Sequence, residues 1–220
     1  MKNNRRAWVF AGGDFVVDHL PMHKVQEQDL VVCVDRGLEH CLQIGLHPDM
    51  LIGDLDSVPQ SLLQDDRIAD VKRYIFPSEK AASDLELALT ILSEGGVDEV
   101  ILLGVSGGRS DHMLFNWQLV RLRQWPFSIQ FIDDTTHTYV LEGAHDIVIE
   151  SAIGSFLSLL AMERSMGVST AGLQYPLSNA VIEAGSTLGL SNVVVSQPVR
   201  VEISSGTLLV IVQRTKKSIH

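Results

Sequence analysis

The stretch Val100-Ile101-Leu102-Leu103-Gly104-Val105-Ser106-Gly107-Gly108-Arg109-Ser110-Asp111-His112 joins an uninterrupted apolar run to a glycine pair and a charged segment. An apolar run over residues 100–105 is typical of a strand buried on both faces of a parallel sheet. Glycines let the backbone approach a ligand, and the N–H groups at the start of the helix that we expect next attract anions. Asp111 and His112 are equally compatible with simple helix capping. Because no Lys-Ser or Lys-Thr follows the glycines, this is not a Walker sequence.

The same alternation of short apolar runs and helical patterns extends over the first 134 residues. It predicts strands at residues 8–11, 30–34, 50–52, 73–76, 100–105 and 129–132, and helices at residues 38–44, 85–92 and 113–125. Strands that alternate with helices are typical of βαβ units. We therefore expect an α/β N-terminal domain with a mainly parallel sheet.

After Asp133-Asp134 the pattern changes to short β-rich runs separated by Gly, Ser and Asn. These runs cover residues 138–141, 146–150, 156–160, 192–195, 199–203 and 208–212. Turn signals at such regular spacing favour an all-β sandwich. The sequence thus predicts two domains, residues 1–134 and residues 135–220.

Composition and charge exclude several classes of protein. The chain has 220 residues and a formal net charge of −10, and the adjacent Lys216 and Lys217 are too few to form a basic surface, so we expect no nucleic-acid partner. The apolar region at residues 147–162 is interrupted by polar residues, which argues against a membrane span. Only Cys33 and Cys41 are present, a number that fits a reducing cytoplasm better than a secreted disulfide scaffold.

A pair of carboxylates follows the expected strand at residues 50–52, in Ile52-Gly53-Asp54-Leu55-Asp56-Ser57. In an extended segment Asp54 and Asp56 would share a face. Magnesium prefers oxygen ligands and often takes one or two carboxylates together with phosphate oxygens. The alternative is a polar turn before the next helix.

A second acidic motif begins a helical pattern, in Lys80-Ala81-Ala82-Ser83-Asp84-Leu85-Glu86. Ser83 and Glu86 have the spacing of a capping box. Asp84 either favours the helix dipole in the first turn or binds a metal. Lys80 either pairs with a phosphate or is simply solvated.

The loops that follow parallel strands meet at one edge of the sheet, where ligands of open α/β folds bind. Ala11-Gly12-Gly13-Asp14 and Val34-Asp35-Arg36-Gly37 join the three motifs above, so five loops bring Asp and Gly to this edge. Such a set predicts phosphoryl or diphosphoryl transfer, in which the protein positions phosphates and a metal neutralises their charge.

Taken in order, these motifs resemble the thiamine pyrophosphokinase family. The matching stretches are residues 34–38, 45–49, 53–57, 83–88, 107–112, 172–177 and 189–192. The resemblance implies that Asp54, Asp56 and Asp84 match metal and phosphate positions. Arg109 matches a phosphate contact, and Asp35 and Asp111 match further active-site acids. Tyr175, Ser191 and Asn192 match the region that holds thiamine.

The resemblance also implies a reaction. ATP with Mg²⁺ would bind the α/β domain, and the thiamine hydroxyl would attack the β-phosphorus so that AMP leaves, with Asp111 or Asp56 as candidates to accept the proton. The protein would be a homodimer with thiamine bound between subunits. One departure is Ala81, where many bacterial members carry an acid. A pterin pyrophosphokinase, which resembles only the α/β half, and a non-catalytic thiamine or ATP sensor are the alternatives.

Overall fold

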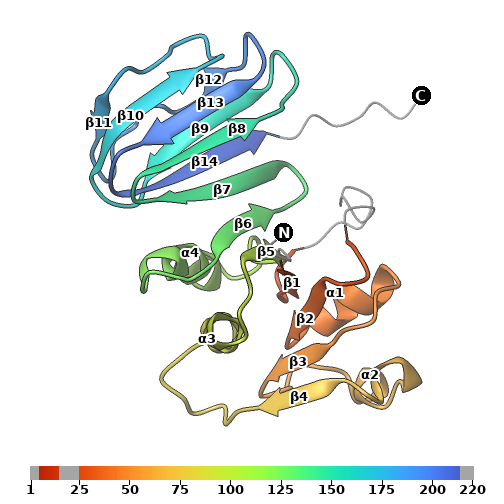
Figure 1. The fold of residues 1–220 in the computed structure, drawn as a ribbon. Helices are drawn as coiled ribbons and strands as arrows, with labels where there is room; N and C mark the ends of the chain where they lie inside the picture. The colour runs from red at the N-terminus through yellow and green to blue at the C-terminus, as the bar shows by residue number, and fades with distance from the viewer. Residues whose placement is uncertain (1–4, 15–24, 214–220) are drawn as a thin grey trace, which may run out of the picture. The chain divides into compact units, whose positions relative to one another are not determined.

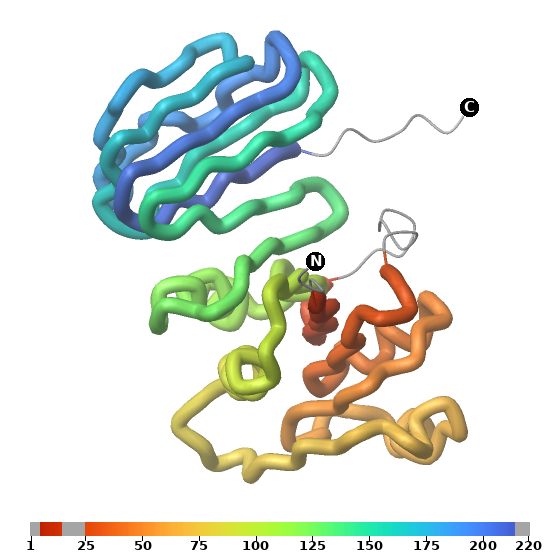
Figure 2. The backbone as a smooth tube through the Cα atoms, in the orientation of Figure 1, coloured from red at the N-terminus to blue at the C-terminus, as the bar shows by residue number. Residues whose placement is uncertain are grey.

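Two continuous segments of the chain fold as separate units in the computed structural model, Met1–Asp134 and Thr135–His220. The structure describes residues 5–14 and 25–213, so Lys216 and Lys217 lie outside the described residues. The colour ramp of Figure 2 shows that each unit is formed by one uninterrupted stretch of sequence.

The first unit is built on a sheet in which every neighbouring pair of strands is parallel. The order is β6-β5-β1-β2-β3-β4. The strands are β1 (Arg6–Phe10), β2 (Leu30–Val34), β3 (Met50–Gly53), β4 (Lys72–Ile75), β5 (Glu99–Leu103) and β6 (Ser128–Ile132). The central strands are apolar and buried because helices cover the sheet. The prediction of an α/β domain is confirmed.

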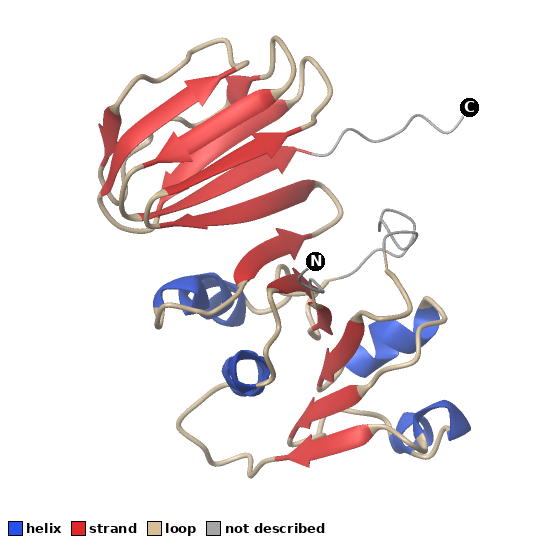
Figure 3. Ribbon diagram, viewed as in Figure 1, coloured by secondary structure: helices blue, strands red, loops and turns tan. Residues whose placement is uncertain are grey.

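Within residues 5–14 and 25–134, four α-helices accompany this sheet: α1 (Gly37–Gln43), α2 (Gln60–Leu63), α3 (Asp84–Glu94) and α4 (Ser110–Gln118). The same residues also form two short 3-10 helices, η3 (Asp66–Ile68) and η4 (Leu119–Arg121). Helix α1 packs against β1 and β2, whereas α3 packs against β2 and β3 from the other side (Figure 3). In the described residues, no helix is both long and apolar enough to cross a membrane.

Several predicted boundaries differ from the structure. The strand expected to reach Val105 ends at Leu103, because Gly104 adopts a left-handed φ of 64° that turns the chain. The helix expected at residues 113–125 begins three residues earlier and gives way to η4 after Gln118. Helix α2 was not predicted, since its single turn is too short to show a period.

The second unit consists of two antiparallel sheets, ordered β12-β9-β14-β7 and β11-β10-β13-β8. Its strands are β7 (Thr136–Glu142), β8 (His145–Ile149), β9 (Phe156–Ala161), β10 (Ser165–Ala171), β11 (Ala180–Ile182), β12 (Asn192–Val193), β13 (Val199–Ile203) and β14 (Thr207–Gln213). Figure 1 shows the two sheets packed face to face. Buried residues from both sheets form one core, for example Leu208 and Val210 of β14 with Val199 and Val201 of β13. The predicted sandwich is confirmed.

Strands β10 and β11 were not predicted from the sequence. Strand β10 reads Ser-Met-Gly-Val-Ser-Thr-Ala, which contains a glycine and three hydroxyl residues. It nevertheless buries Ser165, Val168 and Thr170 toward the core. An irregularity in its pairing with β11, between Ser165 and Val168, breaks the strict alternation that a sequence pattern needs.

A buried carboxylate ties the start of β2 to β1. Asp29 is 6% exposed, and it accepts hydrogen bonds from Arg6 Nη2 at 2.6 Å, Trp8 Nε1 at 2.9 Å and the Gln26 N–H at 2.9 Å. Burial alone would raise the pKa of Asp29, but these hydrogen bonds outweigh it and hold the pKa below its ordinary value. The Asp29 contribution to stability is therefore complete above the ordinary pKa and is lost as pH falls through the lowered one.

We predict that Asp29→Asn lowers the free energy of unfolding at pH 7 by roughly 2–4 kcal/mol, because it leaves buried donors without a charged acceptor. Urea denaturation measures the change. The control is Glu183→Gln, which removes an exposed ion pair with Arg164 and should cost less than about 0.5 kcal/mol. Equal losses in the two variants would contradict the structural role of Asp29.

Candidate active site

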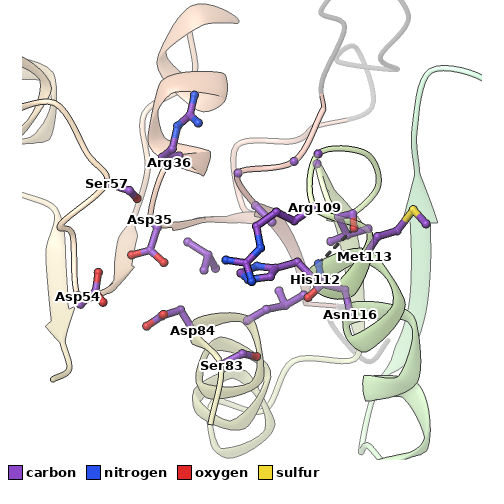
Figure 4. Close-up of a pocket in the computed structure, with 18 of the residues that line it drawn as sticks. Asp35, Arg36, Asp54, Ser57, Ser83, Asp84, Arg109, His112, Met113 and Asn116 are labelled. Atoms are coloured by element: carbon purple, nitrogen blue, oxygen red, sulfur yellow. Dashed lines mark hydrogen bonds between the residues drawn. The ribbon is translucent and has the colours of Figure 1, made fainter. Parts of the chain in front are cut away.

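The loops that follow the five strands from β1 to β5 surround one pocket of about 650 Å³ in the first unit (Figure 4). The five predicted loops all contribute to its lining. The lining residues are Ala11, Gly12, Gly13, Val34, Asp35, Arg36, Asp54, Ser57, Ser78, Lys80, Ala82, Ser83, Asp84, Leu85, Gly104, Val105, Gly107, Gly108, Arg109, His112, Met113 and Asn116. The predicted meeting of these loops at the carboxyl edge of the sheet is confirmed.

Two glycine-rich loops interlock at the base of this pocket. The Gly13 N–H donates to the Gly104 carbonyl at 2.7 Å, and the Asp14 N–H donates to the Ser106 carbonyl at 2.9 Å. A Cβ on Gly13 would lie 2.4 Å from both of those carbonyl oxygens. Only glycine therefore fits at position 13, and the loop after β1 holds the loop that leads to Arg109.

Asp35 lies at the end of β2 in a left-handed conformation with φ of 45°. Its Oδ1 accepts a hydrogen bond from the Leu55 N–H at 3.3 Å. A Cβ on Gly53 would lie only 1.7 Å from this oxygen, so the glycine makes room for the carboxylate. Burial raises the pKa of Asp35 to about 7, and the carboxylates of Asp84 and Asp54 add to the shift.

Lys80 lies between two acidic residues that come from different loops. Its Nζ is 3.0 Å from Asp84 Oδ1 and 3.9 Å from Asp54 Oδ2. Asp54 Oδ1 accepts the Asp56 N–H at 3.1 Å, and this hydrogen bond lowers the pKa of Asp54. The charge of one lysine is thus shared between two carboxylates that face the same space (Figure 4).

Asp56 is placed differently from its neighbour. The residue between the two acids, Leu55, has a φ of 62°, so the segment is not extended as we expected. The two carboxyl groups are nevertheless close enough for a side-chain hydrogen bond. Asp56 is exposed and is not part of the pocket lining. Its interaction with the Asp54 carboxylate raises the pKa of Asp56. A metal-binding role for Asp56 stays a prediction.

The predicted cap of α3 is confirmed. Ser83 precedes the helix, and its Oγ accepts the Glu86 N–H at 3.2 Å. The cap places Asp84 at the first helical position, where its carboxylate faces the pocket. Ser83 therefore has a structural role that is independent of catalysis.

Arg109 precedes α4, and Figure 4 shows its side chain on the pocket side of that helix. Its Nη2 lies 2.6 Å from Asp111 Oδ2 and its Nε lies 3.1 Å from Asp111 Oδ1. This two-point contact lowers the pKa of Asp111 to about 2. Asp111 is exposed and lies outside the pocket lining, so its visible contact is with Arg109.

Sequence reasoning weighed His112 between helix capping and function, but it proposed no role for Arg36, Met113 or Asn116. His112, Met113 and Asn116 line the pocket, and Asn116 Nδ2 also donates to the Val105 carbonyl at 3.2 Å. Residues three or four positions apart share a helix face, so the helix after Arg109 could have indicated all three.

The second unit brings its two sequence motifs side by side. Leu173 forms a β-bridge with Val194, and the Gln174 N–H donates to the Val193 carbonyl at 2.8 Å. Tyr175 is 66% exposed, whereas Asn192 is buried. Ser191 has a φ of 56°, and its N–H donates to Ser158 Oγ at 2.9 Å. The structure thus groups Tyr175, Ser191 and Asn192, although they are up to 17 positions apart.

The first unit combines carboxylates, a lysine, an arginine and glycine loops at the carboxyl edge of a parallel sheet. This combination is typical of enzymes that transfer phosphoryl groups. Residues 22–130 match the family model of the thiamin pyrophosphokinase catalytic domain, and residues 144–208 match that of the thiamin pyrophosphokinase vitamin B1 binding domain. The chain belongs to the thiamine pyrophosphokinase family.

Individual relatives agree with this assignment. The chain is 28% identical over 187 residues to thiamine pyrophosphokinase of Bacillus subtilis, an alignment that covers 84% of this chain and 87% of the relative. It is 26% identical over 221 residues to thiamine pyrophosphokinase 1 of Arabidopsis thaliana, covering 95% and 78%. The crystal structure of the Bacillus subtilis enzyme superposes with a TM-score of 0.82, covering 96% of this chain and all of that one. The structure from Geobacillus thermodenitrificans is 27% identical, with a TM-score of 0.77 and coverage of 98% and 100%.

The raised pKa of Asp35 predicts a pH-dependent cost in stability. Between the ordinary pKa of 3.8 and about 7, the folded state holds a proton that the unfolded state has released. The free energy of unfolding therefore decreases as pH rises through this window. Asp35→Asn removes the cost and should raise stability at pH 8 by on the order of 1 kcal/mol, or about 2–4 °C in Tm, after allowance for partial exposure.

Thermal unfolding from pH 4 to pH 8 tests this prediction. The variant should gain progressively over the wild type as pH rises, with little difference at pH 4. Asp70→Asn, at an exposed position, is the matched control and should follow the wild type throughout. Parallel pH profiles of wild type and Asp35→Asn would show that Asp35 has an ordinary pKa.

Proposed function

We propose that this protein transfers the diphosphate of ATP to the hydroxyl of thiamine, giving thiamine diphosphate and AMP. The observation that carries this proposal is that each unit matches its own part of one family, the catalytic domain in the first unit and the vitamin B1 binding domain in the second. A pterin pyrophosphokinase, which would leave the second match unexplained, and a non-catalytic sensor are not favoured.

ATP binds the pocket of the first unit in this proposal. Its volume of about 650 Å³ is within the usual range for small-molecule sites, about 300–1,000 Å³. Lys80 and Arg109 provide positive charge for the phosphates, and the glycine loops allow them to approach backbone N–H groups. Asp35 completes the nucleotide site. Asp111 orients Arg109 through their two-point contact.

Magnesium fits the chemistry of the donors in this pocket, which are carboxylate oxygens. Among residues 5–14 and 25–213, no three His, Cys, Asp or Glu side chains are close enough to form a metal site alone. Asp54 and Asp84 would therefore supply part of the coordination and ATP phosphates the rest, as is common for magnesium. We keep Asp56, which is two positions after Asp54 in the sequence, as the third candidate ligand. The ion would neutralise charge on the transferred group.

Thiamine binds the second unit, against Tyr175 and Ser191. The Tyr175 ring is exposed, and the face of an aromatic ring attracts a cation such as the thiazolium of thiamine by about 0.5–2 kcal/mol. The hydroxyl of the bound thiamine attacks the β-phosphorus of ATP. A loose transition state requires little base catalysis, so the acids act mainly by holding the metal; Asp56 and Asp111 remain the candidates for accepting the proton.

We further propose that the protein is a cytoplasmic homodimer whose active site combines the first unit of one subunit with the second unit of the other. The support for the dimer is the separation of phosphate-side and thiamine-side residues into different units. The support for the cytoplasm is that Cys33 and Cys41 are both free thiols.

A product assay tests the reaction. Purified protein is incubated with magnesium, ATP and either thiamine or 6-hydroxymethylpterin, and AMP is quantified by chromatography. AMP should accumulate with thiamine and stay at background with the pterin. AMP release with the pterin but not with thiamine would establish the alternative enzyme. If no AMP forms with either substrate, both enzyme functions are excluded.

The proposed metal ligands give a prediction about magnesium. Asp54→Asn and Asp84→Asn should each reduce kcat by at least about 100-fold, because each removes charge that would neutralise and orient the metal. If Asp56→Asn loses as much kcat as the other two variants, Asp56 is also a ligand. A clearly smaller loss means that it is not. Activity is measured across a magnesium titration, with Asp70→Asn as the surface control. Near wild-type activity of Asp54→Asn at every magnesium concentration would disprove the assignment.

The composite site gives a prediction about mixed dimers. Asp54→Asn impairs the first unit and Tyr175→Ala impairs the second, so a mixed dimer should contain one intact site. After subunit exchange at equal amounts, and at a thiamine concentration where each parent is inactive, activity should recover to roughly one quarter of wild type, since about half of the dimers are mixed.

A mixture of Asp54→Asn and Asp84→Asn is the matched control, because every site then has an impaired first unit. It should stay inactive. Full activity of a monomeric species in sedimentation analysis, or no recovery in a mixture proven to contain mixed dimers, would rule out the shared site.

A further inference from the structure

The side chain of Asn192 is used entirely within the second unit. Asn192 is 6% exposed and begins β12. Its Oδ1 accepts the Tyr175 N–H at 3.1 Å and the Val193 N–H at 2.9 Å, and its Nδ2 donates to the Tyr175 carbonyl at 2.7 Å. Both lone pairs of the amide oxygen are thereby occupied. Little of this side chain is left to contact a ligand.

The Asn192 side chain supplies the hydrogen bonds that a neighbouring strand would give to Tyr175, at the point where backbone pairing stops. Leu173 bridges to Val194, and the Gln174 N–H still donates to a neighbouring backbone carbonyl. At Tyr175 the backbone N–H and C=O turn instead to the Asn192 amide. The next residue is Pro176, which has no N–H to donate. The Asn192 amide therefore fixes the last residue before the chain leaves the sheet.

The ring held in this way is presented to solvent. Tyr175 is 66% exposed although both of its backbone polar groups are bonded. A large aromatic ring on a fixed backbone loses little conformational entropy when it stacks on a ligand. Thiamine affinity would then depend on how well the backbone of residue 175 is held.

We propose that Asn192 is a positioning residue for thiamine binding, which acts by holding the backbone of Tyr175 and makes no contact with thiamine itself. This inference rests on the proposed role of the second unit in binding thiamine, and it changes the part that Asn192 has in that site. Loss of the amide frees the Tyr175 loop, so the ring must be ordered again each time thiamine binds.

A double-mutant cycle separates positioning from direct contact. Thiamine dissociation constants are measured by isothermal titration calorimetry for wild type, Asn192→Ala, Tyr175→Ala and the double variant. Asn192→Ala should weaken thiamine binding by about three- to ten-fold in the wild-type background, and by less than about two-fold when the ring is already absent. The dissociation constant for ATP, measured in the same four proteins, should stay constant.

Two further variants keep the test informative if Asn192→Ala folds poorly. Asn192→Asp preserves volume and an acceptor for the Tyr175 N–H, but it sets an anionic oxygen against the Tyr175 carbonyl. It should show the same loss and the same dependence on Tyr175. Ser178→Ala, at an exposed position in the same unit, should bind thiamine like wild type. Circular dichroism confirms that each variant is folded.

Three results would overturn the proposal. Equal losses from the Asn192 substitutions in both backgrounds would mean that Asn192 touches thiamine directly. No loss in the wild-type background would mean that the amide does not matter, and no loss in Tyr175→Ala would mean that the ring does not bind thiamine. Because calorimetry needs no turnover, absence of AMP formation with the coupling intact would count against the proposed reaction alone.

Discussion

The backbone contact between the loops after β1 and β5 is the constraint on which the site in the first unit depends. The Gly13 N–H and the Gly104 carbonyl are 2.7 Å apart, a separation that no side chain at position 13 would permit. This contact sets the path of the loop that carries Arg109 toward the pocket. The neighbouring loop after β2 depends on a similar accommodation, because Gly53 leaves space for the Asp35 carboxylate. Glycines thus determine where the charged groups of the site lie.

The second feature of this site is a close group of three carboxylates. Asp35, Asp54 and Asp84 line one pocket, and Lys80 offsets only part of their charge. Burial and the neighbouring carboxylates together raise the pKa of Asp35. Such crowding of carboxylates costs stability in the free protein, as is common at functional sites. The net charge of −10 makes a local cation such as Lys80 still more important.

Much of the fold could be predicted because its strands leave strong patterns. Continuous apolar runs identified the parallel strands, and the capping spacing of Ser83 and Glu86 located the start of α3. Strand β10 could not be predicted, since its burial depends on partners in β13 and β11 rather than on its own residues.

The residues at the carboxyl edge of the parallel sheet were predicted as a group, but the orientations of their side chains were not. The left-handed conformation of Leu55, which no sequence pattern indicates, leaves Asp54 in the pocket lining and Asp56 outside it. Likewise, the identity of Asn192 does not indicate that its side chain holds a tyrosine backbone 17 positions away.

The central step of the proposed reaction is that both terminal phosphorus atoms of ATP pass together to thiamine at the pocket of the first unit. Its most direct test uses ATP labelled with ³²P at the β position, with products separated by thin-layer chromatography. We expect the label to appear in thiamine diphosphate and the AMP to be unlabelled, because the bond between the α- and β-phosphates is the one that breaks. Label retained in ADP, with thiamine monophosphate as the other product, would contradict it.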